Sequence, residues 1–206
     1  LGSNGRITGG SIRFQNEDLA QKTPAQMRAI RGNQIAMIFQ DPMTALNPVL
    51  TIGKQMAEIL MRNKGLTKKA AKAAAIAMLE KVGIAGAERR YDQYPHEFSG
   101  GMRQRVMIAI ALINNPQVLI ADEPTSALDA RLRNQILELL VQQSEERQMA
   151  MLLISHDLPL VAEHCDRVLV MYQGEKVDEM AANRLPQATH PYTRTLWTCR
   201  PNASTF

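Results

Sequence analysis

The chain has 206 residues, enough for one domain with a subdomain at roughly 150 residues per domain, and its 45% hydrophobic and 21% charged residues exclude a wholly disordered protein. The longest apolar run, 106–113, is far shorter than the roughly 20 residues that cross a bilayer, and the first residues form no signal segment. The chain has 24 basic and 20 acidic residues, which gives a net charge of +4. The basic residues form no block and aromatic residues are few, so the composition gives no support for nucleic-acid binding.

Four short apolar runs predict strands at 35–39, 118–121, 151–154 and 168–172. Each run is continuously apolar, which is typical of strands buried on both faces of a mainly parallel sheet. Helical segments alternate with these strands, so the fold class is α/β. The clearest of these helices spans 130–147, where apolar side chains recur on one helical face.

The middle of the chain differs, because 51–81 contains no strand-like run. A helical stripe is formed by Ile52, Met56, Ile59 and Leu60, and the Ala-rich stretch 68–82 has high helix propensity. We therefore predict a helical insertion between two strands of the sheet. Cys165 and Cys199 lack C-x-x-C spacing, which is typical of a reducing compartment and argues against a disulfide framework or a zinc site.

Polar residues follow three of the predicted strands directly. Gln40 follows the first, Asp122 and Glu123 follow the second, and His156 follows the third. Ligands bind outside the carboxyl ends of strands in open α/β sheets, so these side chains are candidates for one site. The alternative is that strand ends are simply where solvent-exposed loops begin.

Asp122 and Glu123 are adjacent acids delivered by an apolar strand. One carboxylate can hold a hydrated divalent cation while the next orients a water molecule for attack. The alternative is that both acids cap the following helix.

Ser99, Gly100 and Gly101 stand immediately before the helical run 102–113. Serine suits an N-cap, and glycines let a ligand approach the backbone closely. Free N–H groups at a helix N-terminus suit a phosphate. An ordinary helix start with a flexible entry is the alternative.

The order of these motifs resembles the nucleotide-binding domain of ABC transporters over nearly the whole chain. The motifs are Gln40, 98–105 (Phe-Ser-Gly-Gly-Met-Arg-Gln-Arg), 118–124 (Val-Leu-Ile-Ala-Asp-Glu-Pro), 126–129 (Ser-Ala-Leu-Asp) and His156. They resemble the Q-loop, the signature, the Walker B strand with its glutamate, the D-loop and the H-loop. The segments 39–48 and 190–193 are similar to the dipeptide/oligopeptide importer branch.

The resemblance implies a P-loop NTPase-like, mainly parallel sheet with an inserted helical subdomain. On this interpretation 1–47 and 99–185 form a partial α/β ATPase core, 48–98 forms the helical subdomain, and 186–206 belongs to a C-terminal extension.

The resemblance also implies a role for each candidate residue toward ATP and Mg²⁺. Asp122 would bind Mg²⁺, Glu123 would polarise the attacking water, and His156 would contact the γ-phosphate. Gln40 would sense Mg²⁺ and the water, and Asp129 would lie at the interface between subunits. Ser99, Gly100 and Gly101 would contact the γ-phosphate of ATP held by the other subunit.

Three departures from the family pattern stand out. Met102 stands at the fifth position of the signature, where Gln is commoner, and this variant is similar to the signature of the peptide-importer branch. The terminal region has one cysteine, which excludes a Cys₄ iron–sulfur cluster in this chain. No G-x-x-x-x-G-K-S/T sequence occurs. We therefore expect the chain to begin just after the P-loop helix, its sheet to be incomplete with apolar strand surface uncovered, and ATP hydrolysis to be absent from residues 1–206 alone.

These motifs favour the ATP-hydrolysing subunit of a peptide importer, driven by ATP-dependent closure of a homo- or heterodimer. Its expected partners are a second nucleotide-binding subunit, membrane permease subunits and, indirectly, a solute-binding protein. The permease would dock on 48–98 and Gln40, near Leu50 or Met56, at the cytoplasmic face of the bacterial inner membrane. The alternatives are a non-transport ABC ATPase acting on nucleic acid and a non-catalytic scaffold.

Overall fold

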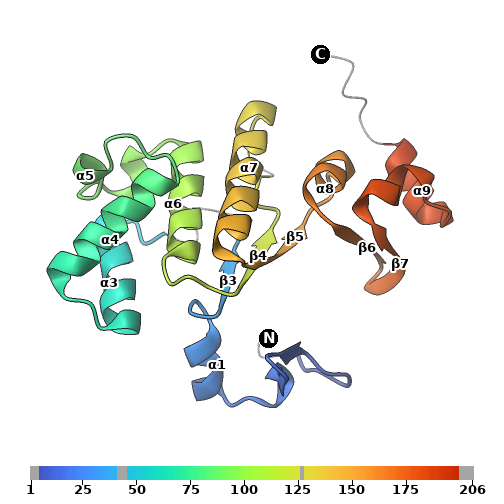
Figure 1. Ribbon diagram of the computed structural model, residues 1–206, viewed down its shortest axis with the longest axis horizontal. Helices are drawn as coiled ribbons and strands as arrows, with labels where there is room; N and C mark the ends of the chain where they lie inside the picture. Colours follow the sequence, from blue (N-terminus) through green and yellow to red (C-terminus); the bar gives the residue numbers. More distant parts are fainter. Residues whose placement is uncertain (1–4, 41–45, 126–127, 200–206) are drawn as a thin grey trace.

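The structure, a computed structural model, describes residues 5–40, 46–125 and 128–199. Its elements are arranged along one long axis (Figure 1). The helices of the middle of the chain lie at one end, a parallel sheet lies near the centre, and a β-hairpin with the last helix lies at the other end. No helix in the described ranges is both long and apolar enough to cross a membrane.

The central sheet has three parallel strands in the order β3 (Ile35–Ile38), β4 (Val118–Asp122) and β5 (Ala150–Ile154). In register, Met37 lies opposite Ile120, and Ile120 lies opposite Leu152. Because all three strands run the same way, their carboxyl ends meet at one edge of the sheet. The predicted α/β class and parallel sheet are confirmed.

One face of this sheet is covered by α6 (Gly100–Leu112) and α7 (Ala130–Arg147). Both helices pack in one core with the buried strand residues, which are Ala36, Ile38, Leu119 and Ala121. The start and end of α7 agree with the predicted helix 130–147.

The opposite face carries large apolar side chains that remain exposed. Met37, Leu152 and Ile154 are 38%, 55% and 44% exposed, and Phe39 beyond the end of β3 is 51% exposed. The prediction that these strands are buried on both faces is therefore wrong for the described chain, because α6 and α7 cover only one face. The expectation of uncovered apolar strand surface is confirmed.

The predicted strand 168–172 is real but does not join the parallel sheet. It is β6 (Arg167–Tyr172), and it pairs antiparallel with β7 (Glu175–Ala181) in a separate two-stranded sheet. Gln173 and Gly174 connect them with positive φ angles of 48° and 85°. A two-residue connection of this kind matches the twist of the flanking strands, which explains the local hairpin.

The middle of the chain is helical, as predicted, with α3 (Ile52–Lys64), α4 (Lys68–Lys81), α5 (Ala87–Arg90) and η2 (Pro95–Glu97). Thr51 and Thr67 cap α3 and α4 through their side-chain oxygens, and Gly65 ends α3 in the left-handed conformation. Ile52, Met56 and Leu60 are buried, while Ile59 is partly buried. The boundaries of the subdomain, 48–98, stay a prediction.

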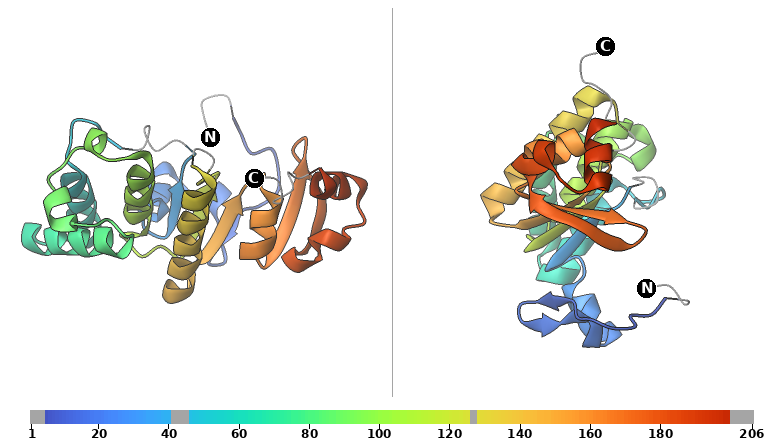
Figure 2. Two further views of the ribbon diagram at one scale, coloured as in Figure 1. Left: turned by 90° about the horizontal axis from the view of Figure 1, so that it is seen from above. Right: turned by 90° about the vertical axis from the view of Figure 1, so that its right-hand side faces the viewer.

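Shorter elements complete the chain. Near the N-terminus lie β1 (Arg13–Phe14), β2 (Glu17–Asp18), η1 (Leu19–Gln21) and α1 (Pro24–Ile30), and after β5 and β7 lie α8 (Leu158–His164), η3 (Ala182–Gln187) and α9 (Pro191–Thr198). The hairpin end of the molecule is visible beside α8 and α9 in Figure 2. It has a core of its own, built on Val168, Val170 and Leu185, and the partly buried Leu153 packs against both this core and the main one.

Candidate functional site

The two predicted acids stand at the carboxyl end of β4. Asp122 is the last residue of the strand, and Ile154 at the end of β5 is its partner in register. Because side chains alternate along a strand, Asp122 lies on the same face as Ile120, which is the uncovered face. Glu123 follows with φ +46°, and its backbone N–H donates to the carbonyl of Ile154 over 2.9 Å.

Glu123 and His156 are brought into direct contact. The Oε1 atom of Glu123 accepts the backbone N–H of His156 over 3.0 Å and lies 2.7 Å from its Nδ1 atom. A carboxylate can only accept, so Nδ1 carries the proton in this pair. The glutamate side chain is 19% exposed and the histidine 82%, so the imidazole lies outermost, where a ligand can reach it.

Sequence reasoning missed the residue that holds this histidine loop in place. Asp157 caps α8 by accepting the N–H of Leu160, and its other oxygen pairs with Arg133 of α7 over 2.8 Å. An aspartate followed closely by a proline in the first helical turn is an N-cap signal. No sequence signal pointed to Arg133 as its partner.

Gln40 follows β3 at the same edge of the sheet and is exposed. The described residues contain no hydrogen bond between Gln40 and Asp122, Glu123 or His156, and no cluster of three or more Asp, Glu, His or Cys side chains that could hold a metal ion. The segment 41–45, which follows Gln40 directly, lies outside the described residues. Gln40 and Asp122 as joint metal ligands therefore stay a prediction.

Ser99 is the N-cap of α6, as predicted, and its Oγ atom accepts the N–H of Met102 over 3.3 Å. The two glycines differ in their surroundings. A Cβ atom on Gly100 would meet nothing within 4 Å, whereas one on Gly101 would lie 2.4 Å from the Cδ2 atom of Leu132. Gly100 thus leaves room for a ligand, while Gly101 is required for close packing of α6 on α7.

Asp129 has a structural role in this chain. Its Oδ1 atom accepts the N–H of Leu132 over 2.9 Å and so caps α7, and the residue is exposed. Ser126 and Ala127 of the same predicted motif lie outside the described residues. A place for Asp129 at a subunit interface stays a prediction.

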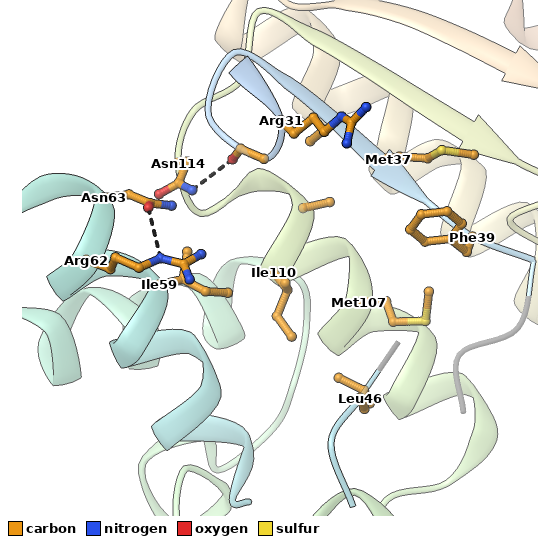
Figure 3. Close-up of a pocket in the computed structure, with 13 residues that line it drawn as sticks. Arg31, Met37, Phe39, Leu46, Ile59, Arg62, Asn63, Met107, Ile110 and Asn114 are labelled. Carbon is orange, nitrogen blue, oxygen red and sulfur yellow. Dashed lines mark hydrogen bonds between the residues drawn. The ribbon is translucent and has the colours of Figure 1, made fainter. Parts of the chain in front are cut away.

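A cavity of about 480 Å³ lies between β3, α3 and α6 (Figure 3). Its apolar lining includes Phe39, Leu46 and Ile110, and its polar lining includes Arg62. Asn114 also lines it, donates to the carbonyl of Gly32 over 2.8 Å, and has a buried Oδ1 atom without a hydrogen-bond partner. Phe39, which immediately precedes Gln40, lines this cavity together with residues of α3 in the helical region.

Comparisons with known proteins give a consistent result. The family model described as "ABC transporter" matches residues 3–126. The chain is 51% identical over 193 residues to the dipeptide transport ATP-binding protein DppD of Bacillus subtilis, covering 93% of this chain and 57% of that protein. It is 49% identical over 200 residues to the oligopeptide transport ATP-binding protein AppD of the same organism, covering 97% and 61%. The chain thus spans about three fifths of the length of these relatives.

A solved structure supports the fold. The dimeric structure of an ATP-binding cassette in a post-hydrolysis state, bound to ADP and Pi, is similar to this chain with a TM-score of 0.76 and 27% identity. The match covers 86% of this chain and 75% of that one.

Proposed function

Because the chain belongs to the ABC transporter family, we propose that it is the part of an ATP-hydrolysing importer subunit that carries the catalytic carboxylate. The observation that carries this proposal is the contact between Glu123 and His156, 2.7 Å apart, directly after the last residue of β4. The names of the similar dipeptide and oligopeptide transport proteins support peptides as the transported class. The whole protein acts at the cytoplasmic face of the bacterial inner membrane, as a peripheral subunit.

Glu123 acts as the general base in this proposal. Its carboxylate orients a water molecule and accepts its proton as the water oxygen bonds to the γ-phosphorus of ATP. The bond from that phosphorus to the β,γ-bridging oxygen breaks, which gives ADP and inorganic phosphate. Phosphoryl transfer needs mainly positioning and charge stabilisation, so a fixed carboxylate beside a hydrogen-bond donor suits it.

His156 contacts the γ-phosphate from the outer side of the pair. When neutral with its proton on Nδ1, its Nε2 atom carries a lone pair and cannot donate to phosphate. The contact therefore requires either a protonated ring or release of Nδ1 from Glu123. Nucleotide binding is thus expected to change the partner or the charge of His156.

The carboxylate of Asp122 at the end of β4 is suited to be one of several ligands of Mg²⁺. Mg²⁺ bound with a nucleotide takes one or two protein carboxylates together with phosphate oxygens and water, so Asp122 alone suffices for the carboxylate. Gln40, at the same edge, would hold the ion through its side-chain oxygen or through water. When bound, the ion neutralises charge on the phosphates.

Residues 1–206 supply only part of the phosphate contacts that this reaction needs. This chain has no P-loop sequence, so the phosphates lack the nest of N–H groups and the lysine that bind them. We infer that the chain alone binds Mg-ATP weakly and does not hydrolyse it. Calorimetry with Mg-ATP tests this inference, and micromolar affinity would contradict it.

The second half of each site comes from a second nucleotide-binding subunit, identical or homologous. Ser99 and Gly100 are exposed at the start of α6, where free N–H groups favour the γ-phosphate of the partner's ATP. Asp129 lies at the same interface. Ser99→Arg in the full-length protein is expected to abolish turnover while the monomer's ATP affinity changes little. A sharp fall in that affinity with dimerisation intact would contradict the assignment.

Permease subunits, served by a solute-binding protein, dock at the cavity between β3, α3 and α6. Its apolar lining beside Gln40 supports a cytoplasmic helix as the occupant. Met56 is fully buried, so a cysteine at that position is unsuited to cross-linking. Arg62 lines the cavity, so Arg62→Cys places a cross-linking thiol there. Glu80 is exposed on α4 away from this cavity, so Glu80→Cys is the control.

The cross-linking result distinguishes this proposal from its alternatives. In the full-length protein without its exposed Cys199, Arg62→Cys is expected to capture a membrane permease subunit and Glu80→Cys is not. Capture of nucleic-acid-associated proteins instead would favour a non-transport ABC ATPase.

Glu123→Gln in the full-length protein tests the catalytic assignment. Loss of a general base lowers a rate by about 10²–10⁴-fold, so turnover should fall by at least 10²-fold while ATP still binds and traps the closed dimer. Glu138→Gln, an exposed change on α7, is the matched control. If Glu123→Gln turns over ATP at the wild-type rate, Glu123 is not the general base. If the wild-type protein itself shows no turnover, a non-catalytic scaffold is favoured.

A further inference from the structure

A buried glutamine links the helix that follows Ser99 to the loop that carries Glu123. Gln104 lies in α6 and is only 2% exposed. Its Nε2 atom donates to the backbone carbonyl of Pro124 over 2.6 Å. A carbonyl oxygen can only accept, so the amide of Gln104 must present its NH₂ group to Pro124.

This hydrogen bond lies next to a strained backbone position. Glu123 has φ +46°, a left-handed conformation that costs a non-glycine residue roughly 1–2 kcal/mol. Such a conformation persists only where surrounding contacts hold it. One contact is the bond from the N–H of Glu123 to the carbonyl of Ile154, 2.9 Å long. The bond from Gln104 to Pro124 holds the other side of the same turn.

The two bonds hold the backbone from which the Glu123 side chain extends. The carboxylate itself is also held by the backbone N–H and the Nδ1 atom of His156. β5 fixes the entry to the turn, and α6 fixes its exit at Pro124. Without the donor on Gln104, the Pro124 carbonyl would lose a buried partner and the turn would be free to relax. The carboxylate would then move relative to His156, to which it is bound at 2.7 Å.

We propose that Gln104 is a positioning residue for Glu123, which couples the start of α6 to the general base of the same chain. The inference rests on the proposed function, because it assigns Gln104 a role in that reaction. In the proposed dimer, Ser99 faces the ATP held by the second subunit, whereas Glu123 acts on the ATP held by its own subunit. Gln104 therefore connects the two ATP sites through a single subunit.

Gln104→Met in the full-length protein tests the proposal. Methionine keeps an unbranched chain and a good helix propensity but has no donor. A misplacement of about 1 Å can cost about 10²-fold in rate, so we expect kcat to fall at least tenfold with the KM for ATP within about twofold of wild type. Peptides that contain 123–125 should also exchange their amide hydrogens faster, because the turn is released.

Gln143→Met is the matched control. Gln143 is 1% exposed and lies in α7, remote from the Glu123 turn. Its side chain donates to Glu146 over 3.3 Å and accepts from the Nε atom of Arg147 over 3.1 Å. Loss of this buried amide should lower the unfolding temperature about as much as Gln104→Met, but leave kcat within about twofold of wild type.

The outcomes separate a positioning role from a merely structural one. Wild-type kcat in Gln104→Met, or parallel loss of kcat and ATP affinity in Gln104→Met and Gln143→Met, would overturn the proposal. If Gln104→Met does not fold, Gln104→Asn decides, because its shorter amide cannot reach Pro124 and kcat must again fall. Wild-type turnover of Glu123→Gln identifies a failure of the proposed function itself.

Discussion

Replacing Gly101 by alanine should destabilise the protein, whereas the same change at Gly100 should not. A Cβ atom on Gly101 would lie 2.4 Å from Cδ2, 3.2 Å from Cδ1 and 3.3 Å from Cγ of Leu132. Carbon atoms are best separated by about 3.5–4.0 Å, so rotating one methyl away brings the other too close. All three of these Leu132 atoms lie closer than that range, so the leucine side chain has to shift away from α6.

The expected magnitude follows from two opposing effects. Overpacking of a well-packed contact costs about 1–3 kcal/mol. Alanine gains about 0.5–1 kcal/mol over glycine within a helix. The free energy of unfolding should therefore fall by about 1 kcal/mol for Gly101→Ala. For Gly100→Ala it should stay the same or rise slightly, because nothing lies within 4 Å of the added methyl group.

Urea denaturation of the full-length protein measures both values, and Leu132→Ala supplies the decisive background. With the leucine removed, Gly101→Ala should no longer be destabilising, which a double-mutant cycle detects as a coupling energy. Equal destabilisation by Gly100→Ala and Gly101→Ala, or an unchanged cost in the Leu132→Ala background, would refute this account of the helix contact.

Two further predictions concern side chains away from the nucleotide site. Burial raises the pKa of the Cys165 thiol, so iodoacetamide should modify the exposed Cys199 well before Cys165, as mass spectrometry of the native protein can measure; equal rates would contradict this. The hydrogen bond and charge of Lys81 hold the pKa of Glu146 below its ordinary value of 4.5. The resulting stabilisation is present above the unfolded-state pKa and is lost as pH falls through the folded-state pKa, so the unfolding temperatures of Lys81→Gln and wild type should converge at low pH.

Local patterns predicted the strands of the parallel sheet and the longest helices, but not the short elements near the two ends of the chain. The apolar runs and the serine before α6 lie within short windows of sequence, so β3–β5, α6 and α7 could be placed from residue types alone. The apolar run alone did not place β6, because such a run does not say which strand it pairs with. Gln173 and Gly174, a turn signal directly after the run, would have favoured a hairpin.

The candidate site was predictable to the same extent. Strand ends that carry Asp122, Glu123 and His156 indicated a common edge, and the contact between Glu123 and His156 lies there. The contacts of Gln104 with Pro124 and of Arg133 with Asp157 join residues 20 and 24 positions apart on different elements. Such contacts depend on how helices pack, and a single sequence carries no periodic signal for them.

The division of the apolar interior into two cores that meet at Leu153 has a consequence for cooperativity. An element that shares few buried side chains with its neighbours can open without them, so the chain need not unfold in one all-or-none step. The hairpin of β6 and β7 with α8, η3 and α9 is expected to form one cooperative unit, and the parallel sheet with the helices from α3 to α7 another. Heat or denaturant would then release the C-terminal unit while α6 still holds the turn at Pro124, and hydrogen exchange would reveal two separate opening energies.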